Sequence, residues 1–340
     1  MRLAFPTRKR SFIFPCVLRE VNGESEAKRE ARDSPTPCLP NPLDEAPMKK
    51  TIVFAAELIA RMPFIPFSLK HFIAMQDPRF FHILPEGKEM IFDKYLGDVK
   101  VRINTVYPVE RQMLTGTYDS MTSTVLGKFL DEGSVAMDIG ANVGALTLLM
   151  AKICGSGRVI AVEPGPPTRS RLMKNLELNP KLRKSITVFP VGASDKPGKL
   201  FWSEDPRNRG NAGLLNGSGT EVDVVTLDDI VARARLTRLD FIKIDVEGME
   251  YEVVKGGLAS IQKYRPLVYY ETLEPFRTFR KFDIYGEIFE AFHSMRYRHF
   301  YFKKNGNMIE IKNMGKLHSS NALAMPAEKA PAREWKSGAP

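Results

Sequence analysis

The sequence is poor in the residues that build disulfide frameworks and membrane spans. It holds only three cysteines, Cys16, Cys38 and Cys154, which do not form a disulfide pattern. We therefore expect a reducing, cytoplasmic compartment. No apolar run approaches the ~20 residues that a membrane-spanning helix needs. The basic and apolar stretch near the start is short and is broken by Pro15, so it resembles a signal peptide only weakly.

Histidine is also scarce, and charge of one sign is in excess. None of the five histidines lies at the end of a predicted core strand, which disfavours a histidine general base. The formal net charge of +10 fits nucleic acid, an acidic substrate, an anionic membrane surface or simply a basic face. Because no recognisable RNA-binding module accompanies this charge, we do not expect a nucleic-acid partner.

Composition divides the chain into four regions. The first alternates charged residues with proline and the last is rich in alanine, proline and lysine, so we expect both to be disordered and a chain of residues 48–318 to keep its fold. Met48, followed by two lysines and an apolar run, is an alternative start. The apolar segment 52–73 should pack on the catalytic domain, form a substrate lid or touch a membrane surface. The predicted regions are a disordered extension at 1–47, a helical and hairpin accessory region at 48–110, a main domain at 111–312 and a disordered tail at 313–340.

The main domain alternates β-branched segments with amphipathic segments of helical period. This alternation predicts an α/β fold with a mostly parallel, doubly wound sheet and a closing antiparallel hairpin. The strands are expected at 134–139, 158–163, 186–194, 222–226, 239–245 and 266–271, with a hairpin signal at 196–204 and the closing hairpin at 297–312.

A glycine-rich turn follows the first core strand and carries the pattern D-x-G-x-N-x-G from Asp138 to Gly144. Glycine allows a sharp turn and a close approach of a ligand to the backbone. Asp138 stands at the carboxyl end of its strand, where open α/β sheets bind ligands. A turn of this kind can also be a purely structural connection between a strand and a helix, with no ligand bound.

The second core strand ends in Glu163, which is placed to accept hydrogen bonds from a ribose diol. The preceding turn lacks the full G-x-G-x-x-G pattern of dinucleotide sites. A carboxylate at the first strand end suits a cofactor that carries an amino group and a sulfonium. S-adenosylmethionine meets that description better than a dinucleotide does.

Several sequence blocks, in order, resemble the FkbM-type S-adenosylmethionine-dependent methyltransferases. They are DIGANVG, AVEP, NLELN, VGASDKPG, GNAGLL, VTLDDI and FIKIDVEGMEYEVVKGG. The resemblance covers residues 109–300 and implies a Rossmann-like class I methyltransferase fold. It also implies O-methylation of a hydroxyl on a sugar or another small molecule.

The same resemblance assigns the cofactor residues. The glycine turn would hold the methionine part of S-adenosylmethionine, Glu163 the ribose, and the end of the third strand the adenine. The residues so assigned are Asp138, Gly140, Asn142, Gly144, Glu163, Gly192, Ala193 and Ser194.

Two acids after the fourth core strand are the candidate catalytic residues. Asp245 and Glu247 should lie near the transferred methyl, where a base can take the proton of the acceptor hydroxyl. Alternatively, they cap a helix that begins near Gly248. Lys243 could neutralise a carboxylate or extend along apolar surface. Without a clear third ligand we expect no metal site.

The sequence therefore predicts a methyltransferase that acts on a hydroxyl of a saccharide or another small molecule. The alternatives are an RNA methyltransferase, suggested by the positive charge, and a cofactor-binding module without catalysis. We expect residues 48–110 and 207–220 to determine the acceptor.

Overall fold

The computed structural model describes residues 89–115, 118–204, 212–215, 219–272, 283–303, 306–313 and 321–331. All of them belong to one compact unit, Lys50–Pro340. The expectations for residues 1–47 and for segment 52–73 lie outside the described residues. Within the described residues, no helix has the length and apolar character required to cross a membrane.

Eight strands form the main sheet: β3 (Val135–Ile139), β4 (Arg158–Val162), β5 (Ile186–Phe189), β10 (Phe241–Ile244), β11 (Leu267–Glu271), β12 (Tyr297–Phe302), β13 (Met308–Ile311) and β14 (Asn321–Pro326). Their order is β13-β12-β14-β11-β10-β3-β4-β5. The five strands from β11 to β5 are parallel, and the other three pair antiparallel. The predicted parallel sheet and its closing hairpin, β12–β13, are confirmed.

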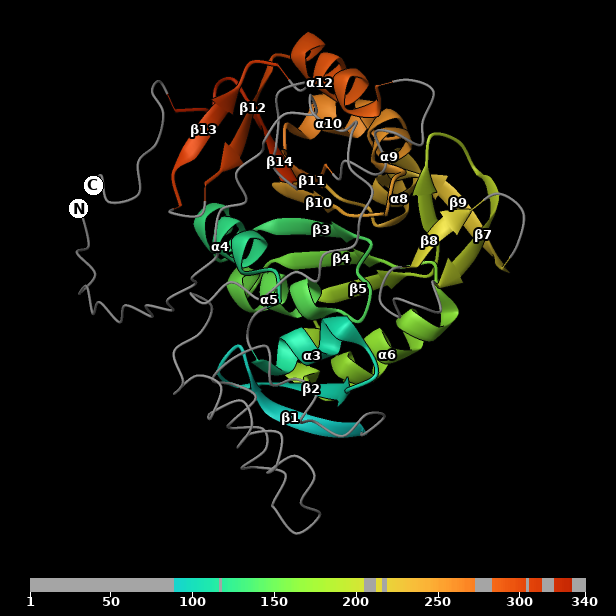
Figure 1. Ribbon diagram of the computed structural model, residues 1–340. Coiled ribbons are helices and arrows are strands. Elements are labelled where there is room, and N and C mark those ends of the chain that lie inside the picture. The colour runs from blue at the N-terminus through green and yellow to red at the C-terminus, as the bar shows by residue number, and fades with distance from the viewer. Residues whose placement is uncertain are drawn as a thin grey trace, which may run out of the picture. The chain divides into compact units, whose positions relative to one another are not determined.

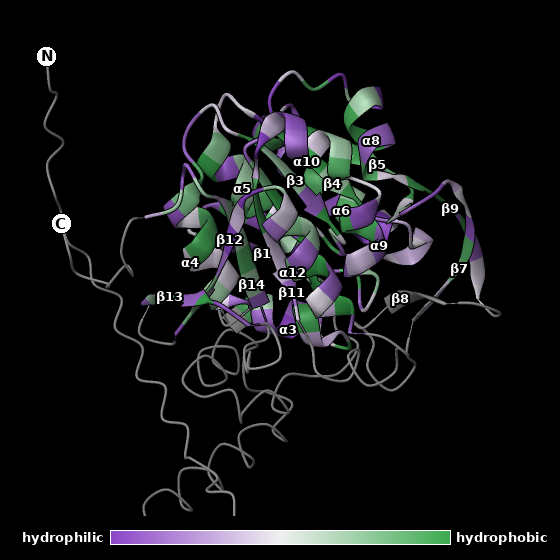
Figure 2. Ribbon diagram, turned by 90° about the horizontal axis from the view of Figure 1, so that it is seen from above, coloured by the Kyte–Doolittle hydropathy of each residue, from purple (hydrophilic) through white to green (hydrophobic). Residues whose placement is uncertain are grey.

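Helices cover both faces of this sheet (Figure 1). One face packs on α4 (Ser120–Phe129), α5 (Ala145–Cys154) and α6 (Pro166–Glu177), and the other on α8 (Leu227–Arg233), α9 (Glu250–Lys255), α10 (Leu258–Tyr264) and α12 (Ile284–Ser294). Neighbouring residues of one strand serve opposite faces, as Ala136 and Met137 do. The predicted doubly wound α/β fold is thus confirmed. In Figure 2 the flanking helices carry both hydrophilic and hydrophobic residues, as helices with one buried side should.

The prediction of a disordered tail from residue 313 is wrong for residues 321–331. β14 inserts between β11 and β12 and pairs with both. Ala322, Leu323, Ala324 and Met325 are all buried. A strand inside a sheet is apolar on both faces and shows no alternation, so a six-residue segment gave little periodic signal within its alanine- and proline-rich surroundings.

An antiparallel hairpin precedes the main sheet, as predicted. It consists of β1 (Glu89–Tyr95) and β2 (Val99–Asn104). The Arg102 amide donates a hydrogen bond to Asn175 of α6 over 2.7 Å. Two further helices, α3 (Pro108–Thr115) and α7 (Pro180–Arg183), complete this side. Val101 and Ile103 are buried in the same hydrophobic core as α5 and α6, so the hairpin is continuous with the main domain.

A second, four-stranded sheet stands beside the main one. Its order is β6-β9-β7-β8, with β6 (Gly192–Ser194), β7 (Gly198–Glu204), β8 (Ala212–Leu215) and β9 (Thr220–Thr226). The prediction of one strand over 186–194 is wrong, because the chain leaves the main sheet after β5 and continues as β6 in the second sheet. Pro190 lies between them and has no amide hydrogen for a strand ladder. The predicted strand-to-helix transition at Thr226 is confirmed by a capping box with Asp229.

Candidate cofactor and acceptor site

A cleft lies at the carboxyl ends of β3, β4 and β10. It is lined by five residues that the sequence assigned to the site, together with Val162, Pro164, Trp202 and Val246 among others; the five are Gly140, Glu163, Gly192, Ala193 and Asp245. Parallel strands end at the same edge of the sheet, which is why residues more than one hundred positions apart meet here. Ser194 is buried beside this cleft but does not line it.

The glycine turn has the left-handed backbone that its sequence indicated. Gly140 and Gly144 have φ values of 81° and 86°, and Asn142 has 50°. A Cβ at Gly140 would overlap the carbonyl oxygen of Asp245, and one at Gly144 would overlap the Leu172 side chain. Both glycines are therefore required by the packing of this domain, in addition to any approach of a ligand.

Glu163 fits the ribose-binding role. Its Oε2 accepts a hydrogen bond from the Asn142 amide, and its Oε1 accepts from the Gly165 amide and the Thr168 hydroxyl, each at 2.8 Å. Burial raises the pKa of this carboxyl, and these hydrogen bonds oppose the rise. The donors fix the carboxylate at the cleft, and an oxygen can accept more than one bond. The hydrogen bond of Glu163 to a ribose hydroxyl stays a prediction.

Asp138 is fully buried and is not among the residues lining the cleft. Its Oδ2 accepts a hydrogen bond from the Thr147 hydroxyl at 2.6 Å, and its Oδ1 lies 3.4 Å from Nζ of Lys243. Burial raises its pKa against the effect of Lys243. In this structure Asp138 therefore acts on Lys243, and its direct contact with a cofactor stays a prediction.

Lys243 neutralises carboxylates rather than reaching along apolar surface. Its ammonium lies 3.1 Å from Oδ2 of Asp245 and donates to the Gly140 carbonyl at 3.2 Å. Burial opposes the charge, but Asp245 and Asp138 together outweigh burial and hold the pKa of Lys243 well above its usual value. The lysine is therefore a fixed cation between the ends of β3 and β10.

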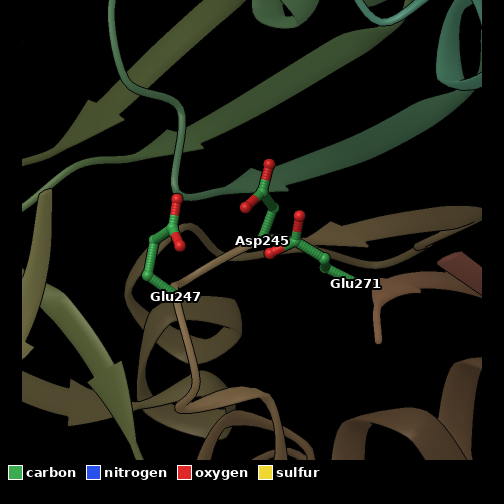
Figure 3. A group of neighbouring side chains, drawn as sticks. All are labelled: Asp245, Glu247 and Glu271. Carbon is green, nitrogen blue, oxygen red and sulfur yellow. The ribbon is translucent and has the colours of Figure 1, made fainter. Parts of the chain in front are cut away.

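Glu271, at the end of β11, joins the two predicted catalytic acids. Asp245, Glu247 and Glu271 each place a carboxylate oxygen within 4.8 Å of the others (Figure 3). The rule that drew attention to Glu163, an acid at the end of a predicted strand, would also have identified Glu271. Three carboxylates this close can share protons or hold a divalent cation, so the expectation of no metal site lacked this third possible ligand.

Two of these acids resist ionisation. Burial, assisted by the neighbouring acids, raises the pKa of Glu247 to about 7 and that of Glu271 to about 10. Oε2 of each is buried and has no hydrogen-bond partner among the described residues. Asp245 has a cationic partner, Lys243, and its side chain is 30% exposed. Of the three, Asp245 is the best placed to accept a proton from a ligand in the cleft.

The capping alternative for Asp245 and Glu247 is wrong. The N-cap residue of α9 is Met249, which makes no side-chain capping bond. Instead, the buried Glu250 accepts hydrogen bonds from the amides of Val246 and Gly248, each at 3.2 Å. Glu250 therefore stabilises the loop after β10, which leaves the two preceding acids available for other contacts.

Comparisons with known proteins find methyltransferases that are similar in sequence to part of this chain. Hexuronic acid methyltransferase AglP of Haloferax volcanii is 29% identical over 136 residues, which are 39% of this chain and 53% of that protein. The 2-O-methyltransferase NoeI of Sinorhizobium fredii is 27% identical over 152 residues, 38% of this chain and 60% of that protein. The chain thus spans only about half to three fifths of the length of these relatives.

A crystal structure of methyltransferase FkbM from Methylobacillus flagellatus is 18% identical and covers 81% of this chain and 59% of that one, with a TM-score of 0.40. Residues 138–299 match the family model described as the methyltransferase FkbM domain. These residues include the glycine turn, Glu163 and all three acids of the cluster. Over these residues, the chain is similar to the methyltransferase FkbM domain.

Proposed function

We propose that this protein transfers the methyl group of S-adenosylmethionine, the methyl donor of the FkbM methyltransferases, to a hydroxyl of a saccharide or another small molecule. The observation that carries the proposal is one cleft lined by both Glu163 and Asp245. The first is held as an acceptor for a ribose and the second as an acceptor for a proton. The names of the relatives, a hexuronic acid methyltransferase and a 2-O-methyltransferase, support a sugar hydroxyl as the acceptor.

When bound, S-adenosylmethionine supplies an electrophilic methyl group on a sulfonium. The protein's part is to align the acceptor oxygen with that methyl, and positioning of this kind can supply ~7–11 kcal/mol of the barrier. Glu163 would hold the cofactor's ribose, and Asp245 would accept the hydroxyl proton of the acceptor as the acceptor oxygen takes the methyl group. Lys243 fixes the orientation of Asp245 through Oδ2.

Glu247 and Glu271 contribute to the acceptor side. With raised pKa values, these carboxyl groups are partly or wholly protonated near neutral pH and can donate hydrogen bonds to a polyhydroxyl substrate. The regions predicted to select the acceptor, 48–110 and 207–220, lie largely outside the described residues, so that role stays a prediction. A cytoplasmic location likewise stays a prediction.

Calorimetry tests the cofactor first. We expect S-adenosylhomocysteine to bind and NAD not to bind; micromolar affinity for NAD without binding of S-adenosylhomocysteine would contradict the proposal. Incubation with methyl-labelled S-adenosylmethionine and a panel of saccharides then tests the reaction. The expected product carries the label on oxygen, and Asp245→Asn protein should form it far more slowly. Label found on RNA instead would favour the RNA methyltransferase alternative.

A further inference from the structure

Trp202 is an aromatic residue of the cleft to which sequence reasoning gave no role. It lies on β7 of the second sheet and is 5% exposed. Its side chain nevertheless lines the same cleft as Glu163 and Ala193. The indole therefore borders the space between the expected ribose acceptor and the expected adenine loop.

Close backbone contacts fix the position of this indole. A Cβ on Gly165 would overlap the ring at Cε2 and Nε1, so the ring lies directly against the backbone that follows Glu163. The backbone of Trp202 is held as well. It pairs with Thr220 of β9, and a Cβ at Gly219 would overlap the Trp202 carbonyl oxygen. An aromatic residue that is held at its ring and at its backbone is already ordered before a ligand binds. This order lowers the entropic cost of binding.

The order of groups in the cleft indicates which part of the cofactor meets this ring. Glu163 marks the ribose, and the small residues Gly192 and Ala193 line the same cleft. In S-adenosylmethionine the group attached to the ribose on the side away from sulfur is adenine, a flat aromatic base. Bases stack on aromatic side chains with affinity effects of about 5- to 150-fold per contact.

We propose that Trp202 forms the aromatic wall of the adenine subsite. The inference rests on the proposed function, since it assumes that S-adenosylmethionine occupies the cleft. It also gives the second sheet a role, which is to carry an aromatic side chain to the cofactor from outside the main sheet.

Tryptophan fluorescence gives a readout that needs neither an acceptor nor catalysis. The chain has two tryptophans, Trp202 and Trp335. In Trp335→Phe protein, Trp202 is the only one. Titration with S-adenosylhomocysteine should change its emission, with a midpoint equal to the dissociation constant from calorimetry. Trp202→Leu should weaken binding by about 5- to 150-fold, and Trp202→Phe by less, because it keeps an aromatic face.

Gly165→Ala tests the same wall without altering the indole. The φ of Gly165 is −65°, which alanine adopts freely, so the new methyl acts on its neighbours, the indole and the Thr168 hydroxyl. If the methyl displaces the indole, Gly165→Ala should weaken binding in the presence of Trp202 and have a smaller effect in the Trp202→Leu background. Equal effects in both backgrounds would assign the loss to Thr168 and Glu163 and count against the proposal.

The outcomes separate this inference from the proposed function. If S-adenosylhomocysteine binds in calorimetry while the Trp202 emission is unchanged and Trp202→Leu keeps full affinity, the adenine wall is refuted and the methyltransferase assignment stands. If the unaltered protein binds no S-adenosylhomocysteine, the proposed function fails, and this inference fails with it. The emission measurement leaves Trp202 unaltered, so a poorly folding Trp202→Leu protein does not prevent the decision.

Discussion

The ammonium group of Lys243 lies 3.1 Å from the carboxylate of Asp245, so these two residues at the end of β10 form an ion pair. Lys243 is buried and also contacts Asp138 and the Gly140 carbonyl. Its ammonium thus lies between two carboxylates and donates a hydrogen bond to one carbonyl. The lysine cannot readily donate a proton in catalysis, because both carboxylates stabilise its charge. Its effect on the reaction is to hold Asp245 in place.

Lys243→Met should destabilise the fold strongly. Removing one member of a buried charge cluster leaves the others uncompensated and typically costs ~3–5 kcal/mol. Urea denaturation measures this loss. Lys255→Met is the matched control, because Lys255 pairs with Asp195 at the same 3.1 Å but is half exposed, so its removal should change stability little. Equal losses of stability in the two variants would show that the burial of Lys243 does not determine how much its removal destabilises the fold.

Gly140→Ala should destabilise the folded state by at least about 1–3 kcal/mol. The residue has a left-handed backbone, and a methyl group would overlap the Asp245 carbonyl. Gly127→Ala, in the middle of α4 with open space around it, should instead raise the free energy of unfolding by about 0.5–1 kcal/mol. Thermal denaturation of both proteins tests whether the two substitutions change stability in opposite directions. An unchanged melting temperature in Gly140→Ala would contradict the close contact between Gly140 and Asp245.

Asp245→Asn should lower turnover by ~10²–10⁴ with cofactor affinity nearly unchanged, because the amide keeps the shape but cannot take the proton. Glu247→Gln should lower turnover less, since a carboxyl with a pKa of about 7 is already partly neutral at working pH. Steady-state rates on an identified acceptor, compared with melting temperatures, test this order. Full activity of the Asp245→Asn protein would show that Asp245 does not take the proton.

Glu271 should make stability depend on pH. Its pKa is about 10 when folded against an ordinary 4.5. Between these values the folded chain keeps a proton that the unfolded chain has lost, so this contribution to stability is complete below the lower value and is lost as pH rises toward the upper one. Relative to Glu271→Gln, the unaltered protein should lose stability from about pH 6 to 9, by at most about 1.4 kcal/mol per pH unit.

Urea denaturation at several pH values, with EDTA present to remove bound cations, measures this difference. Glutamine is the suitable replacement because it resembles the protonated carboxyl in shape and in its ability to donate. Parallel stability curves for the two proteins would show that Glu271 is ionised throughout. If the difference appears only without EDTA, a cation rather than a proton neutralises the cluster.

Truncation tests the role of β14. A chain that ends at residue 318 loses the strand that pairs with both β11 and β12, so it should not unfold cooperatively. A chain that ends at residue 331 keeps β14 and the turn after it, and should melt near the full-length temperature. Circular dichroism during heating distinguishes the two, and a cooperative transition in the shorter chain would contradict the sheet order found here.

Much of the architecture follows from local sequence. Alternation of apolar strands with amphipathic helices is periodic over short distances, so the parallel sheet and the helix cap at Thr226 could be predicted from nearby residues alone. The same holds for Asp138, Glu163 and Asp245, each of which ends a strand. Because parallel strands end at one edge of the sheet, an acid in that position is in or near the site whatever the details of packing.

Tertiary structure alone decided what each of those residues contacts. Whether Lys243 meets Asp245 and Asp138, or Glu271 meets Glu247, depends on which strands are neighbours, and strand order is not encoded in any short segment. The strand β14 and the indole of Trp202 were missed for the same reason. Their roles come from pairing and packing with distant parts of the chain, and the periodicity of a short segment does not predict such contacts. The sequence by itself determined the kind of chemistry at the sheet edge, and the fold determined which side chains share it.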